Sequence, residues 1–461
     1  MMHGVFYESI KDLFSSHFIQ KLKRIITMSA TIMVFMICVK GLNYLYVRED
    51  EWSRKMFYDY YKEQQNIDNL YVGSSHVHWD INPKQLDELN GMNNFNMSIS
   101  DERLDTAYYL IKEVNDQHKL SQVYLEMYYY LNCVYPGKGD LEDFQNKRNG
   151  WRATDYMKWS FNKLEYMGEI WGNKKGVDTW LPFVRYRERL FDTDYINEIM
   201  ERKQNTDYKR CVYYYVYEDG SGSIEYQDKG YVCGTRKLTE SEMRFGKSLV
   251  FNPGVGIAES SEIYLRKIIE YCKKHKINIT LITSPIFNLQ LLSTENYDEY
   301  INQVFSIAEE YGIAYYDFNL IKPEYLDIQS KEYFANTDHL TSAGGELYTY
   351  YLWEISNRTP EENEIYFCKS YQEKLSLENP KLYGYYYWGS EGKMCCKIAS
   401  NREEGMEYRI WITPEGTEEY LLQDFSTNKT FQLPIDGHGM ITIEARMGDV
   451  PSEIQTLEVA Y

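Results

Sequence analysis

Two changes in the pattern of apolar and polar positions divide the chain into three parts. The first part contains an almost unbroken apolar run from Ile25 to Val47, in which Lys40 is the one charged residue. A helix rises about 1.5 Å per residue, so a run of this length crosses a hydrocarbon core of roughly 30 Å. Lys40 lies near the end of the run, where its charged group can reach the interface. We therefore expect a transmembrane anchor at 25–47, after an N-terminal segment at 1–24.

The charges on the two sides of this run predict its orientation. Basic residues predominate before it, at Lys11, Lys21, Lys23 and Arg24, whereas Arg48 is followed at once by Glu49, Asp50 and Glu51. Because basic flanks stay in the cytoplasm, we expect a single-pass protein of the cell membrane, with a cytoplasmic N-terminus and the remaining chain outside. A cleaved signal peptide is the alternative, but the apolar run is long and no small-x-small cleavage site follows it cleanly.

The second part alternates short apolar runs with helical patterns, after an amphipathic, linker-like helix at 48–66. Strands are predicted at 67–72, 94–97, 122–127 and 277–283 and from Ile313 onward. Apolar residues recur at helical spacing from Leu104 to Val114, and Ser293 is expected to cap a helix that ends near Gly312. This alternation predicts an α/β domain at 67–358, built on a doubly wound, flavodoxin-like parallel sheet.

Residues 132–256 interrupt the alternation with aromatic helical patches and a hairpin-like stretch. An insertion of this length forms either a cap over the strand ends or a packing subdomain with no role at the site. Cys211 and Cys233 flank the hairpin, and they either form a cross-strand disulfide or remain two free thiols. The eight cysteines are too sparse for a disulfide scaffold, and none has the spacing of a zinc site.

The third part, at 359–461, consists of short β-rich segments separated by turn residues, which predicts a small all-β, sandwich-like domain. Charge then narrows the choice of partners. A formal net charge of −19 over 461 residues argues against nucleic acid, because dense phosphate would be repelled. The 46 tyrosines offer stacking faces for sugars, although ordinary packing is the simpler explanation.

Two polar turns follow predicted strands at the same edge of the sheet. Gly73-Ser74-Ser75-His76 comes after the first strand, and Asn336-Thr337-Asp338-His339-Leu340 comes after the last strand region. A Ser and a His so placed can act as nucleophile and general base, with a neighbouring polar side chain orienting the imidazole. The alternative is that Ser75 caps a helix and that His339 is a surface or turn residue.

Four segments around these turns resemble the conserved blocks of the SGNH (GDSL-like) hydrolase family. They are LYVGSSHVHWDINP, FNMSISDERLD, QVYLEMYYY and NTDHLTSAGG, and the resemblance covers roughly 67–353. It is closest to the membrane-anchored branch with a GSS turn, similar to proteins that serve D-alanylation or O-acetylation of surface polymers. The resemblance implies that Ser75 is the nucleophile, that its own N–H is an oxyanion donor, and that His339 is the base.

Three positions depart from the family pattern. Asn336 stands where the family has the Asp that orients the base, so this role falls to Asn336 or to the adjacent Asp338. Asp101 stands at the oxyanion Gly, where its N–H can donate but its carboxylate disfavours an oxyanion. Tyr130 takes roughly the place of the family Asn, so the phenol would have to replace that donor.

Three further polar residues lie near the predicted site. His76 and His78 flank Ser75 and suggest a metal, but no carboxylate or Cys has supporting spacing, so we interpret them as lining or hydrogen-bonding residues. Glu126 ends a buried strand, where a neighbouring turn is expected to satisfy its carboxylate. We therefore expect no metal and no cofactor.

These patterns predict a serine-dependent O-acyl esterase or acyltransferase that acts outside the cytoplasm on a cell-envelope polysaccharide or similar acylated polymer. A membrane acyl-donor protein as partner is an implication of the family resemblance alone. The competing hypothesis is a catalytically weak or inactive SGNH-like protein that binds a glycan or assists envelope assembly. A purely structural envelope protein would explain the anchor but not the paired Ser and His turns.

Overall fold

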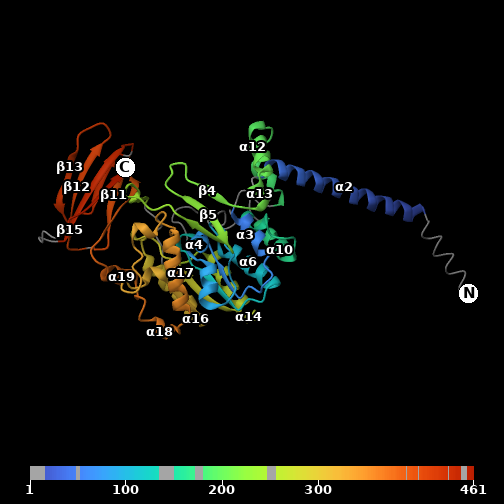
Figure 1. Ribbon diagram of the computed structural model, residues 1–461, viewed down its shortest axis with the longest axis horizontal. Coiled ribbons are helices and arrows are strands. Elements are labelled where there is room, and N and C mark those ends of the chain that lie inside the picture. Colours follow the sequence, from blue (N-terminus) through green and yellow to red (C-terminus); the bar gives the residue numbers. More distant parts are fainter. Residues whose placement is uncertain are drawn as a thin grey trace, which may run out of the picture. The chain divides into compact units, whose positions relative to one another are not determined.

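The computed structural model describes residues 16–47, 52–133, 150–171, 180–246 and 256–461, apart from 391, 403, 435 and 448–453 (Figure 1). Contacts divide the chain into two compact units. The first is Met1–Asp50 with Lys174–Arg210, and the second is Glu51–Asn173 with Cys211–Tyr461. The insertion expected at 132–256 is therefore shared between the two units, and its stretches 134–149, 172–179 and 247–255 lie outside the described residues.

The first unit is helical. It contains α2 (Ser16–Tyr46), the 3-10 helix η1 (Pro182–Arg189), α12 (Thr193–Gln204) and α13 (Thr206–Arg210). Helix α2 is long and apolar enough to cross a membrane over the 29 residues from Phe18 to Tyr46, and it is exposed along the apolar part. The apolar N-terminal helix is thus confirmed. That it spans a membrane, and in which orientation, remains a prediction, because length and composition alone can also admit a signal sequence near the N-terminus.

A five-stranded parallel sheet forms the centre of the second unit. Its spatial order is β2 (Asn94–Asn96), β1 (Asn69–Val72), β3 (Gln122–Glu126), β8 (Asn278–Thr283) and β9 (Ala314–Asp317). These are the five predicted strands, so the parallel α/β architecture is confirmed. The order is 2-1-3-4-5 along the chain, which is one of the two common doubly wound orders.

Alternate side chains of the strands enter two different cores, as a strand period of two requires. Leu70 and Val72 of β1 pack with one set of helices, and Tyr71 between them packs with another. The first set is α3 (Trp52–Tyr60), α6 (Leu104–Gln117), α14 (Glu259–His275) and α16 (Tyr297–Tyr311). The second set is α4 (Ser75–Asp80), α5 (Pro83–Asn90) and α17 (Ser342–Ser356). Helices therefore cover both faces of the sheet.

Two local predictions differ from the structure. Helix α3, inside the stretch expected to be a linker, buries Trp52, Met56 and Phe57 in the core of the α/β unit. Ser293 does not cap the helix that ends before Gly312, because its hydroxyl donates back to Gln290 O at 2.6 Å and ends the short helix α15 (Asn288–Leu292). Helix α16 begins only at Tyr297.

The C-terminal part is β-rich, as predicted, and it continues the core of the α/β unit. After α18 (Pro360–Asn363) and α19 (Tyr371–Leu377) come β10 (Leu382–Ser390), β11 (Lys393–Ser400), β12 (Met406–Pro414), β13 (Tyr420–Ser426), β14 (Thr430–Pro434), β15 (Gly439–Met447) and β16 (Gln455–Ala460). They form two four-stranded sheets, β14-β11-β10-β7 and β13-β12-β15-β16. Strand β7 (Arg244–Gly246) comes from the insertion and pairs parallel to β10.

Helix α7 (Tyr129–Asn132) leads into the insertion. The other described elements of the insertion in this unit are α9 (Trp151–Thr154), α10 (Phe161–Trp171), β4 (Tyr214–Val216), β5 (Ser223–Asp228), β6 (Tyr231–Gly234) and the 3-10 helix η2 (Glu240–Glu242). The predicted hairpin gains a third strand, in the order β4-β5-β6. Cys211 precedes β4 and Cys233 lies on β6, so β5 separates the two strands that a disulfide would have to join. Both are free thiols, as are the other six cysteines, all of which the structure describes.

The burial of α3 can be tested by a pair of substitutions one residue apart. Phe57 is 1% exposed and Tyr58 is 38% exposed. We expect Phe57→Ala to lower the free energy of unfolding by about 3–5 kcal/mol, because it leaves a cavity in the core. Tyr58→Ala should change it by no more than about 0.5 kcal/mol. Urea denaturation of the full chain in detergent measures both, and equally small losses would show that α3 is a peripheral linker.

Candidate active site

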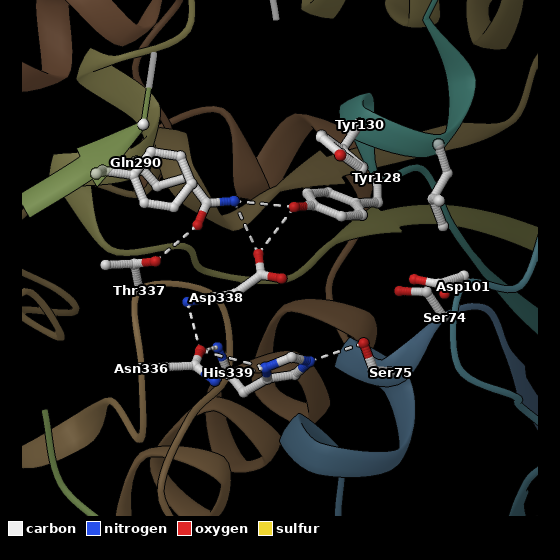
Figure 2. Close-up of a pocket in the computed structure, with 13 residues that line it drawn as sticks. Ser74, Ser75, Asp101, Tyr128, Tyr130, Gln290, Asn336, Thr337, Asp338 and His339 are labelled. Carbon is white, nitrogen blue, oxygen red and sulfur yellow. Dashed lines mark hydrogen bonds between the residues drawn. The ribbon is translucent and has the colours of Figure 1, made fainter. Parts of the chain in front are cut away.

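The two predicted turns meet at the carboxyl ends of the parallel strands (Figure 2). Ser75 begins α4, directly after β1, and His339 lies in the turn that precedes α17. Strands β2 and β3 flank β1 on opposite sides, so the chain order reverses there and leaves a crevice between β1 and β3. Ligands of doubly wound sheets bind at such a point.

The local structure of the GSS turn presents the Ser75 hydroxyl. The alternative in which Ser75 caps a helix is wrong, because Ser74 is the N-cap of α4 and its Oγ accepts from His76 N–H at 3.4 Å. Gly73 allows the close approach of β3, since a Cβ there would lie 2.4 Å from Glu126 Cβ. The Ser75 N–H is at the first helical position, where no intrahelical acceptor exists.

Ser75 and His339 form a direct hydrogen bond. The distance from Ser75 Oγ to His339 Nε2 is 2.7 Å. Asn336 Oδ1 accepts from the backbone N–H groups of Asp338 and His339, both at 2.8 Å, and these two bonds fix which amide atom is the oxygen. The same Oδ1 lies 3.2 Å from His339 Nδ1. Asn336 Nδ2 lies 3.2 Å from the same ring nitrogen. The tautomer that carries its proton on Nδ1 donates to Oδ1 and leaves Nε2 as the acceptor of the Ser75 proton.

Asn336, rather than Asp338, thus occupies the orienting position beside His339. Asp338 Oδ1 instead accepts from Tyr128 Oη at 2.8 Å and from Gln290 Nε2 at 2.9 Å. Gln290 Oε1 in turn accepts from Thr337 Oγ1 at 2.9 Å. Figure 2 shows the Asp338 carboxylate bound to Tyr128 and Gln290, while the Asp338 backbone N–H donates to Asn336 in the group that contains His339.

Behind Ser75, His76 lies between two carboxylates. Its Nδ1 is 2.8 Å from Glu126 Oε1, and its Nε2 is 3.2 Å from Asp338 Oδ1. Burial lowers the pKa of His76, but the charges of Asp338 and Glu126 outweigh burial and raise this pKa well above its usual value. His76 is therefore an imidazolium at neutral pH, placed to donate from both ring nitrogens.

The same contacts shift the pKa values of Asp338 and His339. Burial raises the pKa of Asp338, yet the charge of His76 and its hydrogen bond outweigh burial and hold this pKa well below its usual value. Burial lowers the pKa of His339 to about 4, against the opposing charge of Asp338 and with the support of the His76 imidazolium. The two imidazole rings are nearly parallel, with centroids 5.3 Å apart. At neutral pH, His339 is the neutral ring that a general base requires.

A cavity of about 470 Å³ opens in front of Ser75 and His339. Its lining includes the other two predicted oxyanion residues, Asp101 and Tyr130, together with Phe245 from the insertion strand β7. The Asp101 backbone has φ +52°, the left-handed conformation that favours the glycine expected at this position. Tyr130 keeps 42% of its surface exposed. The insertion therefore contributes at least one wall of the cavity.

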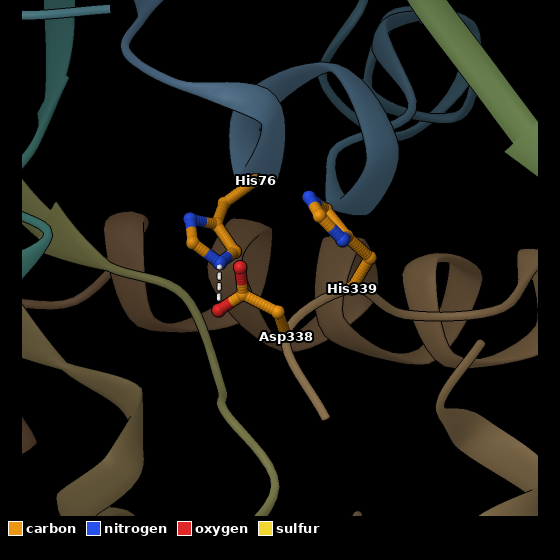
Figure 3. Close-up of side chains that lie close together, drawn as sticks. All are labelled: His76, Asp338 and His339. Atoms are coloured by element: carbon orange, nitrogen blue, oxygen red, sulfur yellow. Dashed lines mark hydrogen bonds and ion pairs between the residues drawn. The ribbon is translucent and has the colours of Figure 1, made fainter. Parts of the chain in front are cut away.

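His76, Asp338 and His339 also place one ligand atom each within 4.8 Å of one another, which is close enough to hold a metal ion (Figure 3). The donor set does not fit one. Both nitrogens of His76 already face carboxylates, and both nitrogens of His339 are bound to Ser75 and Asn336. A protonated imidazole has no lone pair for a metal. The arrangement favours proton sharing over metal binding.

Sequence reasoning placed Ser75 and His339 together and missed two residues that hold their surroundings. Tyr128 and Gln290 were not predicted, and no local pattern marks them, because both bind Asp338 in a turn far along the chain, where Gln290 also accepts from Thr337. Glu126 is satisfied by the neighbouring turn as expected, since Ser74 N–H donates to its Oε2 at 2.5 Å. His78 is a hydrogen-bonding residue, with Nδ1 3.3 Å from Ser98 Oγ.

The charge on His76 can be tested through the pKa of His339. In His76→Gln the neighbouring positive charge is removed, so we expect the pKa of His339 to rise from about 4 toward the ordinary value. His78→Gln is the matched control on the same helix, because burial lowers the pKa of His78 and keeps this ring neutral. NMR titration of chains with ¹³C-labelled histidine measures the shift. An unchanged His339 pKa in His76→Gln would contradict the buried imidazolium.

Comparisons with known proteins do not extend this description. No model of a known protein family matches the chain, and no curated protein has a sequence similar enough to count as a match. The likeness of four short segments to the SGNH hydrolases is therefore supported by neither comparison. A proposal of function therefore rests on the geometry around Ser75 and His339.

Proposed function

We propose that this chain is a membrane-anchored serine esterase or acyltransferase of the SGNH type, which acts outside the cytoplasm on O-acyl groups of a cell-envelope polysaccharide. The observation that carries the proposal is the 2.7 Å hydrogen bond from Ser75 Oγ to His339 Nε2, at the edge of an open cavity. A hydroxyl, a neutral imidazole and an orienting amide are a nucleophile, a base and its positioning group, a combination that also serves in Cys-His-Asn proteases.

In the first step, Ser75 Oγ attacks the ester carbonyl carbon while its proton moves to His339 Nε2. The new C–O bond turns the carbonyl oxygen into an oxyanion. When this intermediate collapses, the original ester C–O bond breaks, and the proton on His339 passes to the departing sugar oxygen. Ser75 then carries the acyl group, and His339 is neutral again.

In the second step, a hydroxyl group attacks the acyl-Ser75 ester. His339 takes the proton of the attacking oxygen and returns a proton to Ser75 Oγ as the acyl bond breaks. Water as the attacking group gives hydrolysis, and a sugar hydroxyl gives transfer. Both use the same acyl-enzyme, so the site chemistry is one proposal with two acceptors.

Backbone donors stabilise the oxyanion in this proposal. Ser75, Asp101 and Tyr130 all line the cavity, and we assign the oxyanion donors to the backbone N–H groups of Ser75 and Asp101 and to the phenol of Tyr130. The aromatic faces of Tyr130 and Phe245 offer a sugar ring an apolar surface. The N-terminal apolar helix supports a substrate at the membrane face, because an anchored enzyme meets envelope polymers there.

A second candidate is a glycan-binding protein that has little or no catalytic activity. The amide of Asn336 favours it, because a neutral group stabilises an imidazolium less than a carboxylate does. The carboxylate of Asp101 in the cavity lining favours it as well. Both candidates share the cavity, so covalent reactivity of Ser75 separates them.

Covalent labelling with a serine-reactive phosphonate tests the nucleophile. We expect one adduct on the full chain in detergent, at Ser75, and none on Ser75→Ala. His339→Ala should label about 10²-fold more slowly or less, because the base is removed. Ser74→Ala is the matched control and should still label at Ser75, since the Ser74 hydroxyl faces His76. Intact-mass spectrometry follows the reaction, and a folded chain without an adduct would favour the glycan-binding candidate.

Two substitutions decide which polar side chain orients His339. Asn336→Asp supplies a carboxylate in the same place, and we expect it to speed labelling of Ser75 by about tenfold or more, because it stabilises the imidazolium. Asp338→Asn leaves the Asn336 contact intact and should retain labelling within about tenfold. The labelling rates at pH 7 measure both. Slow labelling of Asp338→Asn beside an unchanged rate for Asn336→Asp would assign the orienting role to Asp338.

A further inference from the structure

In the first unit, the C-terminal end of α2 packs against a later segment of the chain (Figure 1). From Phe18 to Gly41 the helix is exposed at every position except Val39, which is half-buried. From Leu42 to Val47, except at the exposed Tyr44, the chain is covered by a segment at 180–204, here called the collar, which comprises Trp180, η1 and α12. Tyr46 packs there against Tyr195 and Ile199 of α12.

The collar also binds the backbone at the end of α2. Lys203 is buried and donates from Nζ to Tyr44 O at 2.7 Å and to Val47 O at 2.9 Å. Tyr195 Oη donates to Tyr46 O at 2.8 Å. The last carbonyls of a helix have no intrahelical partner, and leaving them so in an apolar setting is unfavourable. The collar therefore satisfies the end of α2 with its own side chains.

The apolar helix fixes the depth of the collar relative to a membrane. If the hydrocarbon core begins at Ile25, a span of roughly 30 Å at about 1.5 Å per residue ends close to Tyr44. Tyr44 is a residue whose carbonyl Lys203 binds. The collar thus begins where the hydrocarbon core ends, at the level of the lipid headgroups.

The composition of the collar suits that level. Phe191 is 90% exposed and lies two residues after η1, and Trp180 is 37% exposed. Arg187 and Arg189 on η1 are exposed as well, and Arg189, which pairs with Asp192 at 3.1 Å, still keeps 60% of its side chain accessible. Aromatic rings are enriched at membrane interfaces, and arginine is a strong ligand of phosphate groups. A nine-tenths exposed phenylalanine that closely follows two exposed arginines in the sequence fits a phospholipid surface, with an apolar layer below the phosphates.

We propose that the collar lies in the headgroup layer, with the Phe191 ring inserted among the acyl chains and the guanidinium groups of Arg187 and Arg189 bound to lipid phosphates. The collar would then hold the C-terminal end of α2 at a fixed depth at the membrane surface. The proposal needs α2 to cross the membrane, and it does not depend on the chemistry at Ser75. Failure of Ser75 labelling therefore leaves it unaffected.

Photocrosslinking of the full chain tests the collar directly. Phe191→benzoylphenylalanine is placed in nanodiscs of phosphatidylethanolamine and phosphatidylglycerol, in which the scaffold protein is the one other polypeptide. After irradiation we expect a mass increase of one phospholipid, located in the peptide that contains position 191. A folded chain without lipid adducts, or with adducts only to its own residues, would overturn the proposal.

Charge reversal separates the phosphate contacts from the apolar one. In the photocrosslinking chain, Arg187→Glu with Arg189→Glu should lower the yield of lipid adduct severalfold, because carboxylates repel the phosphates. Lys209→Glu with Arg210→Glu makes the same change of charge on α13, outside the collar, and should leave the yield unchanged. Equal yields in both double variants would remove the arginines from the proposal.

Hydrogen exchange of the unsubstituted chain gives an independent result if a variant fails to fold. Amides of 181–204 should exchange more slowly in the phospholipid nanodiscs than in dodecyl maltoside, which has no phosphate. Peptides of the parallel sheet serve as the internal control and should exchange alike in both. Equal exchange of the collar in the two media would count against lipid contact.

Discussion

A buried imidazolium between two carboxylates is the interaction on which the site depends. Glu126 ends β3, Asp338 lies in the turn before α17, and His76 on α4 binds both of them. Removing one member of a buried ion pair typically costs about 3–5 kcal/mol, because the remaining charge has no compensation. His76 therefore joins three elements that are far apart in the sequence. Through Glu126, which accepts from Ser74 N–H, the same cluster holds the turn that presents Ser75.

Because the Asp338 carboxylate is bound by other side chains, the residue that orients the His339 ring is Asn336. The Asp338 carboxylate is committed to His76, Tyr128 and Gln290, so the neighbouring His339 has to be oriented by another group. The Asn336 amide fulfils that geometric role through bonds to two backbone N–H groups and to the ring. An amide partner makes His339 a weaker base than a carboxylate partner would. The neutral Asn336 and the nearby His76 imidazolium both disfavour protonation of His339, so the ring stays neutral down to low pH.

The sequence allowed prediction of features that depend on local pattern. Each strand of the parallel sheet was visible as a short apolar run. Ser75 and His339 were visible as residues of polar turns at strand ends, because both kinds of signal lie within a few residues. Features that depend on distant partners were not visible. The core position of Phe57 and the contacts of Gln290 are set by residues that only the fold brings together. The same reason hid β7, whose partner strand β10 comes much later in the chain.

The conformation of Asp101 bears on whether the site has lost its oxyanion donor. Glu102 N–H donates to Ile99 O at 3.2 Å, and Ile99 N–H donates to the buried Glu102 carboxylate at 2.8 Å. This turn imposes φ +52° on Asp101, at about 1–2 kcal/mol for a residue with a side chain. Asp101 therefore keeps the left-handed backbone that a glycine would adopt at this position, and the departure from glycine adds strain and a nearby carboxylate. Because the backbone geometry is kept, these features favour the proposed esterase or acyltransferase, acting slowly, over a surface that only binds a glycan.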